Sequence, residues 1–187
     1  MHTRNFHLTQ FAVLCILVLS FSSFEVATSN VIGFDLGTKF FKITLVKPGQ
    51  PFSIVENTAT KRKTETMVTF TEDTRLFGAD SYIEQTKYPL NSFGAMHKYL
   101  GQSYDMEFVE NQRKQRFLLN EIVEDDRGLI GWKVKKNPKD SEEEPDIFYT
   151  EELIAMILKY GKKLSETQAG GTVRDCVITI PSYFDYI

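Results

Sequence analysis

A short run near residue 35 combines an acid, a glycine and a hydroxyl in a pattern suited to phosphate chemistry. Asp35, Gly37 and Thr38 follow a stretch of apolar residues. Glycine lacks a Cβ, so its backbone can approach a ligand closely, and the amides of such a turn can converge on an anion. One carboxylate beside phosphates suits Mg²⁺, which keeps several of its waters. The run therefore predicts a site for Mg²⁺ and phosphate. The alternative is an ordinary glycine-containing hairpin in which Asp35 accepts backbone hydrogen bonds.

Two strands are expected to meet at this turn and to position it. Residues 31–36 are mostly apolar, as in a buried strand, and residues 40–46 carry an apolar side chain at alternate positions. A third strand is expected over residues 52–55, which completes an antiparallel meander. Two short strands are expected at residues 67–70 and 75–77.

The second half of the chain adds a long helix and a final strand. Apolar residues spaced at helical intervals predict a helix over residues 150–168, capped by Thr150 and ended by Gly170. A strand is expected over residues 173–180, stopped by Pro181. A helix followed by an apolar strand favours an α/β or α+β fold.

The middle of the chain is less regular. Short helices are expected over residues 79–88 and 90–100, the second ended by Gly101. A hairpin is expected near Gly128 and Gly131, and an exposed hairpin tip or loop over residues 133–145.

The composition narrows the class of protein. The 187 residues include 22 basic and 25 acidic ones, for a net charge of −3, and 42% are hydrophobic. This balance disfavours a nucleic-acid binder, and the apolar content is too high for a disordered chain. Two cysteines are too few for a disulfide framework.

The first 29 residues have the layout of a secretory signal peptide. An apolar run over residues 11–24 is too short to cross a bilayer, and small residues follow it at Ala27 and Ser29. We expect cleavage before Asn30 and no membrane association afterwards; an uncleaved signal anchor is the alternative. Cleavage would leave Cys176, which lies between Asp175 and Val177 in a β-like run, and this position predicts a buried, inert thiol.

Three segments resemble the heat shock protein 70 family. They are Val31-Ile32-Gly33-Phe34-Asp35-Leu36-Gly37-Thr38, Tyr149-Thr150-Glu151-Glu152-Leu153 and Val177-Ile178-Thr179-Ile180-Pro181-Ser182-Tyr183-Phe184. Within the family, the chain is most similar to a large member of the endoplasmic reticulum. The resemblance implies an actin-like (ribonuclease H-like) α/β ATPase fold, with residues 30–187 forming an incomplete nucleotide-binding domain, its first lobe only.

The resemblance also implies the roles of particular residues. Asp35 would hold Mg²⁺ through water, and ATP or ADP would lie against a phosphate-binding turn. That turn comprises Gly37, Thr38, Lys39 and Phe40. Pro181 and Tyr183 would take part in signalling between domains.

A catalytic pair is placed by counting back from Gly101. The family's catalytic lysine precedes a basic residue shortly before a glycine, and this count reaches His97, with Lys98 beside it. A neutral imidazole is a poorer phosphate partner than a fixed ammonium. We therefore expect ATP binding rather than efficient hydrolysis.

The expected function is that of an ATP-binding chaperone of the endoplasmic reticulum lumen. Its partners would be unfolded polypeptides and a lumenal seventy-kilodalton chaperone, whose nucleotide it would help to exchange. Two alternatives stay open: a small-molecule kinase of the same fold, and a non-enzymatic fragment that binds a partner through an exposed sheet edge.

Overall fold

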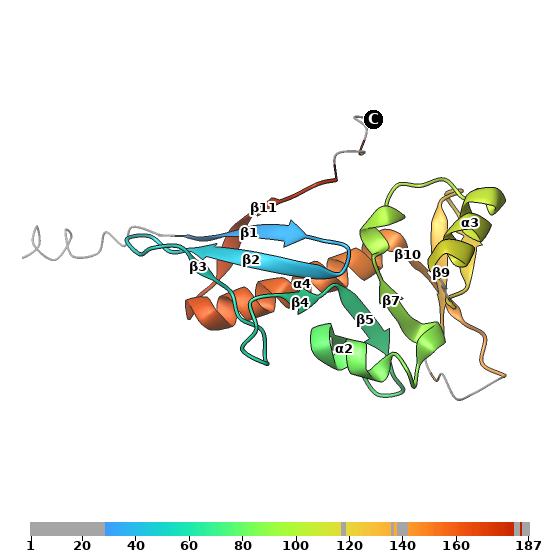
Figure 1. The fold of residues 1–187 in the computed structure, drawn as a ribbon, viewed down its shortest axis with the longest axis horizontal. Helices are drawn as coiled ribbons and strands as arrows, with labels where there is room; N and C mark the ends of the chain where they lie inside the picture. Colours follow the sequence, from blue (N-terminus) through green and yellow to red (C-terminus); the bar gives the residue numbers. More distant parts are fainter. Residues whose placement is uncertain (1–28, 117–118, 136, 138–141, 182–183, 185–187) are drawn as a thin grey trace, which may run out of the picture.

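The computed structural model describes residues 29–116, 119–135, 137, 142–181 and 184, which form a mixed α/β arrangement (Figure 1). Three sheets are present in this part of the chain. The main sheet has the order β11-β1-β2-β3, with β4 paired to β2, and β11 runs parallel to β1. Its strands are β1 (Asn30–Leu36), β2 (Phe40–Val46), β3 (Ser53–Ile54), β4 (Thr64–Glu65) and β11 (Val173–Ile178).

Two smaller antiparallel sheets lie beyond the main sheet. One contains β5 (Met67–Phe70), β6 (Arg75–Phe77) and β7 (Ser92–Gly94), and the other contains β8 (Ile122–Glu124), β9 (Ile130–Val134) and β10 (Asp146–Tyr149). The helices are α2 (Gly78–Glu84), α3 (Met106–Arg116) and α4 (Thr150–Ala169), with short 3-10 turns η1 (Pro89–Asn91) and η2 (Met96–Lys98). Figure 1 shows α4 running along the main sheet toward the smaller sheets.

The predicted meander is confirmed. β1 and β2 pair in the register that places Leu36 opposite Phe41, and β2 pairs with the short strand β3. The side chains of β2 alternate, because one set is buried on the side of α4 and the other is partly or fully exposed. The expected hairpin at Gly128 and the strands at residues 67–70 and 75–77 are confirmed as well.

Helix α4 packs closely on the main sheet. Its apolar side joins the main-sheet core, in which Phe34 and Phe41 stack with ring centroids 5.0 Å apart. Gly161 allows this approach, because a Cβ there would overlap the Phe34 ring and lie 2.9 Å from Ile43 Cδ1. The predicted boundaries of this helix are nearly those observed, with Gly170 ending it at φ 68°.

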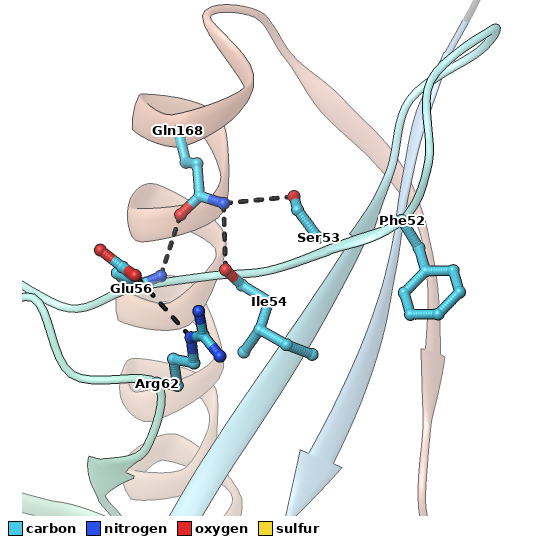
Figure 2. Close-up of a pocket in the computed structure, with 6 residues that line it drawn as sticks. All are labelled: Phe52, Ser53, Ile54, Glu56, Arg62 and Gln168. Atoms are coloured by element: carbon cyan, nitrogen blue, oxygen red, sulfur yellow. Dashed lines mark hydrogen bonds and ion pairs between the residues drawn. The ribbon is translucent and has the colours of Figure 1, made fainter.

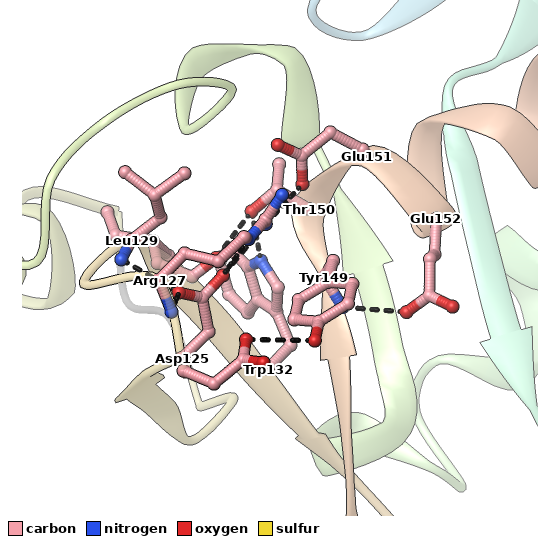
Figure 3. A network of polar contacts seen from close by, with 10 residues as sticks. Asp125, Arg127, Leu129, Trp132, Tyr149, Thr150, Glu151 and Glu152 are labelled. Carbon is pink, nitrogen blue, oxygen red and sulfur yellow. Dashed lines mark hydrogen bonds and ion pairs between the residues drawn. The ribbon is translucent and has the colours of Figure 1, made fainter.

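A polar network ties the start of α4 to the β8–β9 hairpin (Figure 3). The buried Asp125 carboxylate accepts hydrogen bonds from the backbone of Arg127 and Leu129 and from the Arg127 guanidinium. Arg127 also reaches Glu151 at 3.0 Å. Burial opposes ionisation of Asp125, but these hydrogen bonds outweigh it and hold the pKa of Asp125 below its ordinary value.

The expectation that Thr150 caps α4 is wrong. Tyr149 is the N-cap residue, and its N–H donates to Glu152 Oε2 at 2.9 Å. Thr150 lies inside the helix, where its hydroxyl accepts from Trp132 Nε1 and donates to the Ile130 carbonyl. Two partners on β9 therefore occupy this hydroxyl, and Glu152 takes the capping role.

The other end of α4 is held by Gln168 (Figure 2). Its side-chain amide donates to the Ile54 carbonyl at 3.1 Å, and its oxygen accepts from the Glu56 backbone at 2.9 Å. The neighbouring hollow has a volume of about 620 Å³ and contains none of the sequence-predicted site residues. Its wall includes the Arg62–Glu56 ion pair and the exposed ring of Phe52.

The helix expected over residues 90–100 is wrong. That stretch is broken into η1, β7 and η2, and Ala95 takes a left-handed φ of 58°. Phe93, Met96 and Tyr99 are all buried in a core cluster that also contains Val68, Trp132 and Leu153. Their spacing resembles that of a helix, although the chain between them is not helical. Three other elements are shorter than expected. Helix α2 covers residues 78–84 and not 79–88, strand β3 covers 53–54 and not 52–55, and strand β11 covers 173–178 and not 173–180.

The expectation of a buried Cys176 is also wrong, since the residue is exposed. β11 is the edge strand of the main sheet, and its residues after Val173 are exposed. An apolar run on an edge strand can stay uncovered, and sequence alone does not separate it from a central strand. The expected signal peptide falls almost wholly outside the described residues.

Candidate functional site

Six of the nine sequence-predicted site residues meet at a cleft at the end of the first hairpin. The cleft has a volume of about 450 Å³ and is formed by the β1–β2 turn, by η2 and by the residues that follow β11. Its lining residues are Asp35, Leu36, Gly37, Thr38, His97, Lys98, Thr179, Ile180 and Pro181. Three segments distant in the sequence are thus brought together by the parallel pairing of β1 with β11 and by the packing of η2 on α4.

The turn itself is tightly held. The Gly37 N–H donates to the Asp35 carbonyl at 3.2 Å, and a Cβ at Gly37 would overlap the carbonyl oxygen of Phe40. Buried Thr66 fixes the turn from the other side, because its hydroxyl donates to the Gly37 carbonyl at 2.8 Å and its N–H to the Lys39 carbonyl at 3.0 Å. The turn therefore requires glycine, and the protein's own hydrogen bonds fix its shape.

The Asp35 carboxylate faces the cleft half-exposed, with 48% of its side-chain surface accessible. Lys42 Nζ lies 2.6 Å from Oδ2, and Thr179 Oγ1 lies 3.4 Å from Oδ1. Within the described residues this carboxylate accepts hydrogen bonds from side chains and from no backbone N–H. This arrangement differs from the hairpin alternative, in which backbone hydrogen bonds would occupy Asp35.

His97 forms the opposite wall and contacts the turn directly. The residue is 6% exposed, and its Nε2 lies 3.3 Å from Thr38 Oγ1. The left-handed Ala95 immediately before η2 turns the chain so that His97 and Lys98 reach the cleft. His97 of the predicted catalytic pair is therefore in contact with Thr38 of the predicted phosphate turn.

Two predicted residues point elsewhere. Lys39 is exposed, and its Nζ lies 5.5 Å from the centroid of the Phe40 ring. Lys63 approaches the same ring at 4.7 Å, and neither Lys39 nor Phe40 lines the cleft. Tyr183 lies outside the described residues, whereas Pro181 borders the cleft.

The polar groups of the cleft fit a hydrated cation that is bound mainly by phosphate oxygens of a ligand. No group of three or more His, Cys, Asp or Glu side chains suited to a metal occurs among the described residues. One half-exposed carboxylate, a bare glycine turn and a hydroxyl match Mg²⁺ that keeps its waters and binds mainly through phosphate oxygens. Lys98 adds positive charge at the cleft, whereas the ammonium of Lys42 is paired with Asp35.

Sequence reasoning assigned no role to three residues that shape this site. Thr179 accepts from the Leu36 N–H at 3.2 Å and donates its own N–H to the Phe34 carbonyl, so it locks β11 to the turn. Thr66 and Lys42 are the other two. Lys42 could have been found, because the hairpin register places it directly opposite Asp35. No local sequence pattern marks Thr66 or Thr179 as part of the site.

Comparison with known families decides the family. The family model described as Hsp70 protein matches residues 31–186. The chain belongs to the Hsp70 family. This Hsp70-family chain is 34% identical to hypoxia up-regulated protein 1 of Danio rerio over 180 residues, which are 95% of this chain and 17% of that protein.

Other relatives have the same name. Hypoxia up-regulated protein 1 of Xenopus laevis is 31% identical over 92% of this chain and 26% of its own length. That of Homo sapiens is 31% identical over 84% of this chain and 15% of its own length. The chain thus spans between 15% and 26% of the length of these three relatives. No helix in the described part of this Hsp70-family chain is long and apolar enough to cross a membrane.

Proposed function

We propose that this chain supplies one wall of the Mg²⁺-nucleotide site of an ATP-binding chaperone with an actin-like ATPase fold. The observation that carries the proposal is the meeting of Asp35, the Gly37–Thr38 turn and His97 at one cleft. Membership of the Hsp70 family supports a nucleotide as the ligand. A turn that has no side chain at Gly37 and is held by Thr66 favours phosphate over a bulkier anionic group.

Each residue has a defined part in binding. Asp35 would accept hydrogen bonds from water on Mg²⁺, and the bound metal would neutralise phosphate charge. The backbone at Gly37 and the hydroxyl of Thr38 would contact phosphate oxygens, while His97 orients that hydroxyl through the 3.3 Å contact. Lys98 would supply positive charge from the opposite wall.

We assign this segment phosphate binding and not bond cleavage. Phosphoryl transfer needs the metal, the phosphate cradle and the groups that position water to be assembled together. The described residues supply a single metal-facing carboxylate, and the predicted catalytic position holds His97, which in its neutral form lacks the fixed charge of a lysine. Turnover therefore depends on groups outside this cleft wall.

The cellular setting follows from the N-terminal segment. A signal peptide at residues 1–29 would direct the chain to the endoplasmic reticulum lumen, where it would serve protein folding and the stress response. Binding of unfolded polypeptides and nucleotide exchange on a lumenal seventy-kilodalton chaperone are proposed for the whole protein. Sequencing the N-terminus of the protein isolated from cells should find Asn30 as the first residue, and an intact Met1 would contradict the signal peptide.

A second candidate function is partner binding through β11. Val177 and Ile180 on and after this edge strand are 69% and 68% exposed, which leaves an apolar edge open to another chain. Membership of the Hsp70 family favours both of these functions over a small-molecule kinase.

Equilibrium binding of Mg-ATP to the native polypeptide tests the main proposal. The double variant Asp35→Ala with Gly37→Val should lose most of the affinity, because it removes the metal-facing acid and fills the turn. The pair Asp73→Ala with Gly171→Val, outside the cleft, serves as the matched control and should bind normally. Equal affinity of the first variant and the wild type would remove the assignment.

A further inference from the structure

A second hollow lies between α4 and the β6–α2 segment. Its volume is about 810 Å³, and no residue lines both this groove and the candidate nucleotide cleft. Its floor is apolar and its rim is charged, a combination that the nucleotide proposal does not use. We call it the α4 groove, defined by Arg75, Phe77, Met156, Lys159, Tyr160 and Lys163.

The floor of the α4 groove is held in place by stacked rings. Phe77 and Tyr160 stack with centroids 4.9 Å apart and planes 11° from parallel, and Met156 lies beside them partly buried. Gly78 permits this arrangement, because it has a φ of +59° and a Cβ there would lie 2.7 Å from Thr64 Cγ2. The chain can thus enter α2 directly after Phe77, and the stacked rings of Phe77 and Tyr160 form the apolar floor.

The rim is dominated by cations. The rim has four exposed basic residues, namely Arg75, Lys159, Lys162 and Lys163. It has two acidic residues, Asp80 and Glu166. Glu166 is already engaged, since it lies 3.7 Å from Lys162 and accepts from the Val173 N–H.

Lys159 and Lys163 carry the excess positive charge. They lie one helical turn apart on α4, and neither has an ion pair within the described residues. Like charges at this spacing disfavour a helix. A positive rim on a chain of net charge −3 is a local feature that suits an anionic partner.

We propose that the α4 groove binds an acidic peptide segment of a partner protein, with an apolar side chain between carboxylates. The apolar residue would lie on the Phe77–Tyr160 floor, and the flanking carboxylates would pair with Lys159 and Lys163. A small inorganic anion would leave the apolar floor unused. Single-stranded RNA is disfavoured because the two rings stack on each other and two carboxylates share the rim.

Fluorescence anisotropy with two labelled peptides tests this proposal on the native polypeptide. The probe is Gly-Glu-Glu-Phe-Glu-Glu-Leu-Gly, and its neutral counterpart has Gln in place of each Glu. The wild type should bind the acidic probe more tightly than the neutral peptide, and its binding of the acidic probe should weaken as salt is added. The variant Lys159→Gln with Lys163→Gln should lose about fivefold or more in affinity, as expected for two partly exposed ion pairs.

The matched control is Lys61→Gln with Lys114→Gln, which makes the same change in net charge on exposed residues outside the groove. It should bind the acidic probe like the wild type. If both double variants lost the same affinity for the acidic probe, the effect would be one of net charge, and the proposal would be overturned. Equal binding of the acidic and neutral peptides by the wild type would overturn it as well. Tighter binding of a polyuridylate oligomer that displaces the probe would also overturn it in favour of RNA. Mg-ATP binding should be unchanged in the groove variant, which separates this proposal from the nucleotide site.

Discussion

Asp35 and Lys42 face each other across the first hairpin, with 2.6 Å between the carboxylate Oδ2 and the ammonium Nζ. The pair is half-exposed at the cleft where Asp35 is proposed to face Mg²⁺. The ammonium therefore occupies one side of the carboxylate that hydrated Mg²⁺ would approach. Lys42 is expected to compete with the metal and to set the Mg²⁺ concentration at which nucleotide binds.

Replacing Lys42 by Gln should strengthen Mg²⁺ binding in the presence of ADP. An exposed ion pair is worth about 0.2–1 kcal/mol, which corresponds to about a 1.4- to 5-fold gain in affinity. Calorimetric titration with Mg²⁺ measures it, and Lys61→Gln in an exposed loop serves as the control. Weaker binding in Lys42→Gln would mean that the ammonium contacts phosphate and does not compete with the metal.

Gly37→Ala should destabilise the fold and weaken nucleotide binding. The added Cβ would overlap the Phe40 carbonyl, so the turn must shift, at a cost of about 1–3 kcal/mol. Gly33→Ala in β1, the strand that leads into this turn, is the matched control, because the nearest atom to its Cβ is Thr44 Cβ at 4.0 Å. Urea unfolding of both variants measures the difference; equal stability would show that the turn tolerates a side chain.

Much of the fold is predictable because its signals are local. The side chains of β2 alternate between buried and exposed, and α4 carries its apolar residues on one side and ends at a glycine. Both patterns reflect contact with a single covered face. The Asp35–Gly37–Thr38 turn was found in the same way, because acid, glycine and hydroxyl are adjacent in the chain.

The errors come from tertiary context. Phe93 and Met96 have helical spacing and are both buried, but the chain between them turns at Ala95, which has a left-handed φ. Alanine rarely adopts this conformation, so the sequence gives no sign of the turn. Cys176 lies in an apolar run whose position at the sheet edge depends on strand order. Thr66 and Thr179 reach the cleft through pairings between distant segments, which one sequence does not reveal.

Acid should remove the stabilisation supplied by Asp125. Burial opposes its ionisation, but hydrogen bonds from Leu129 and Arg127 hold its pKa below the ordinary value of 3.8. The stabilisation is therefore present above about pH 4 and is lost as the pH falls through the folded-state pKa. Asp125→Asn should cost about 1–3 kcal/mol at pH 7, and the gap to the wild type should narrow in acid.

Neighbouring Asp126 is the control for this experiment. It is exposed and accepts one hydrogen bond, from the Tyr149 hydroxyl at 2.9 Å. Asp126→Asn should change stability by less than about 0.5 kcal/mol. Thermal unfolding from pH 2 to pH 7 measures both variants, and a gap for Asp125→Asn that does not change with pH would contradict the assigned ionic role.

Cys176 should react with iodoacetamide in the folded protein. The residue is exposed on β11, whereas partial burial of the thiol raises its pKa above the ordinary value. Less thiolate is then present at neutral pH, so labelling should be slow at pH 7 and faster toward alkaline pH. Peptide mass spectrometry locates the label, and Cys176→Ser provides the blank. Labelling that requires denaturant would restore the buried assignment.

Hydrogen–deuterium exchange of the native polypeptide, with and without Mg-ADP, tests the central claim most directly. Bound nucleotide should slow exchange at the Gly37–Phe40 turn, at residues 96–98 and at residues 178–181, and should leave the hollow beside Phe52 and Gln168 unchanged. Protection confined to that hollow, or no protection of the turn at saturating Mg-ADP, would contradict the nucleotide site proposed for this cleft.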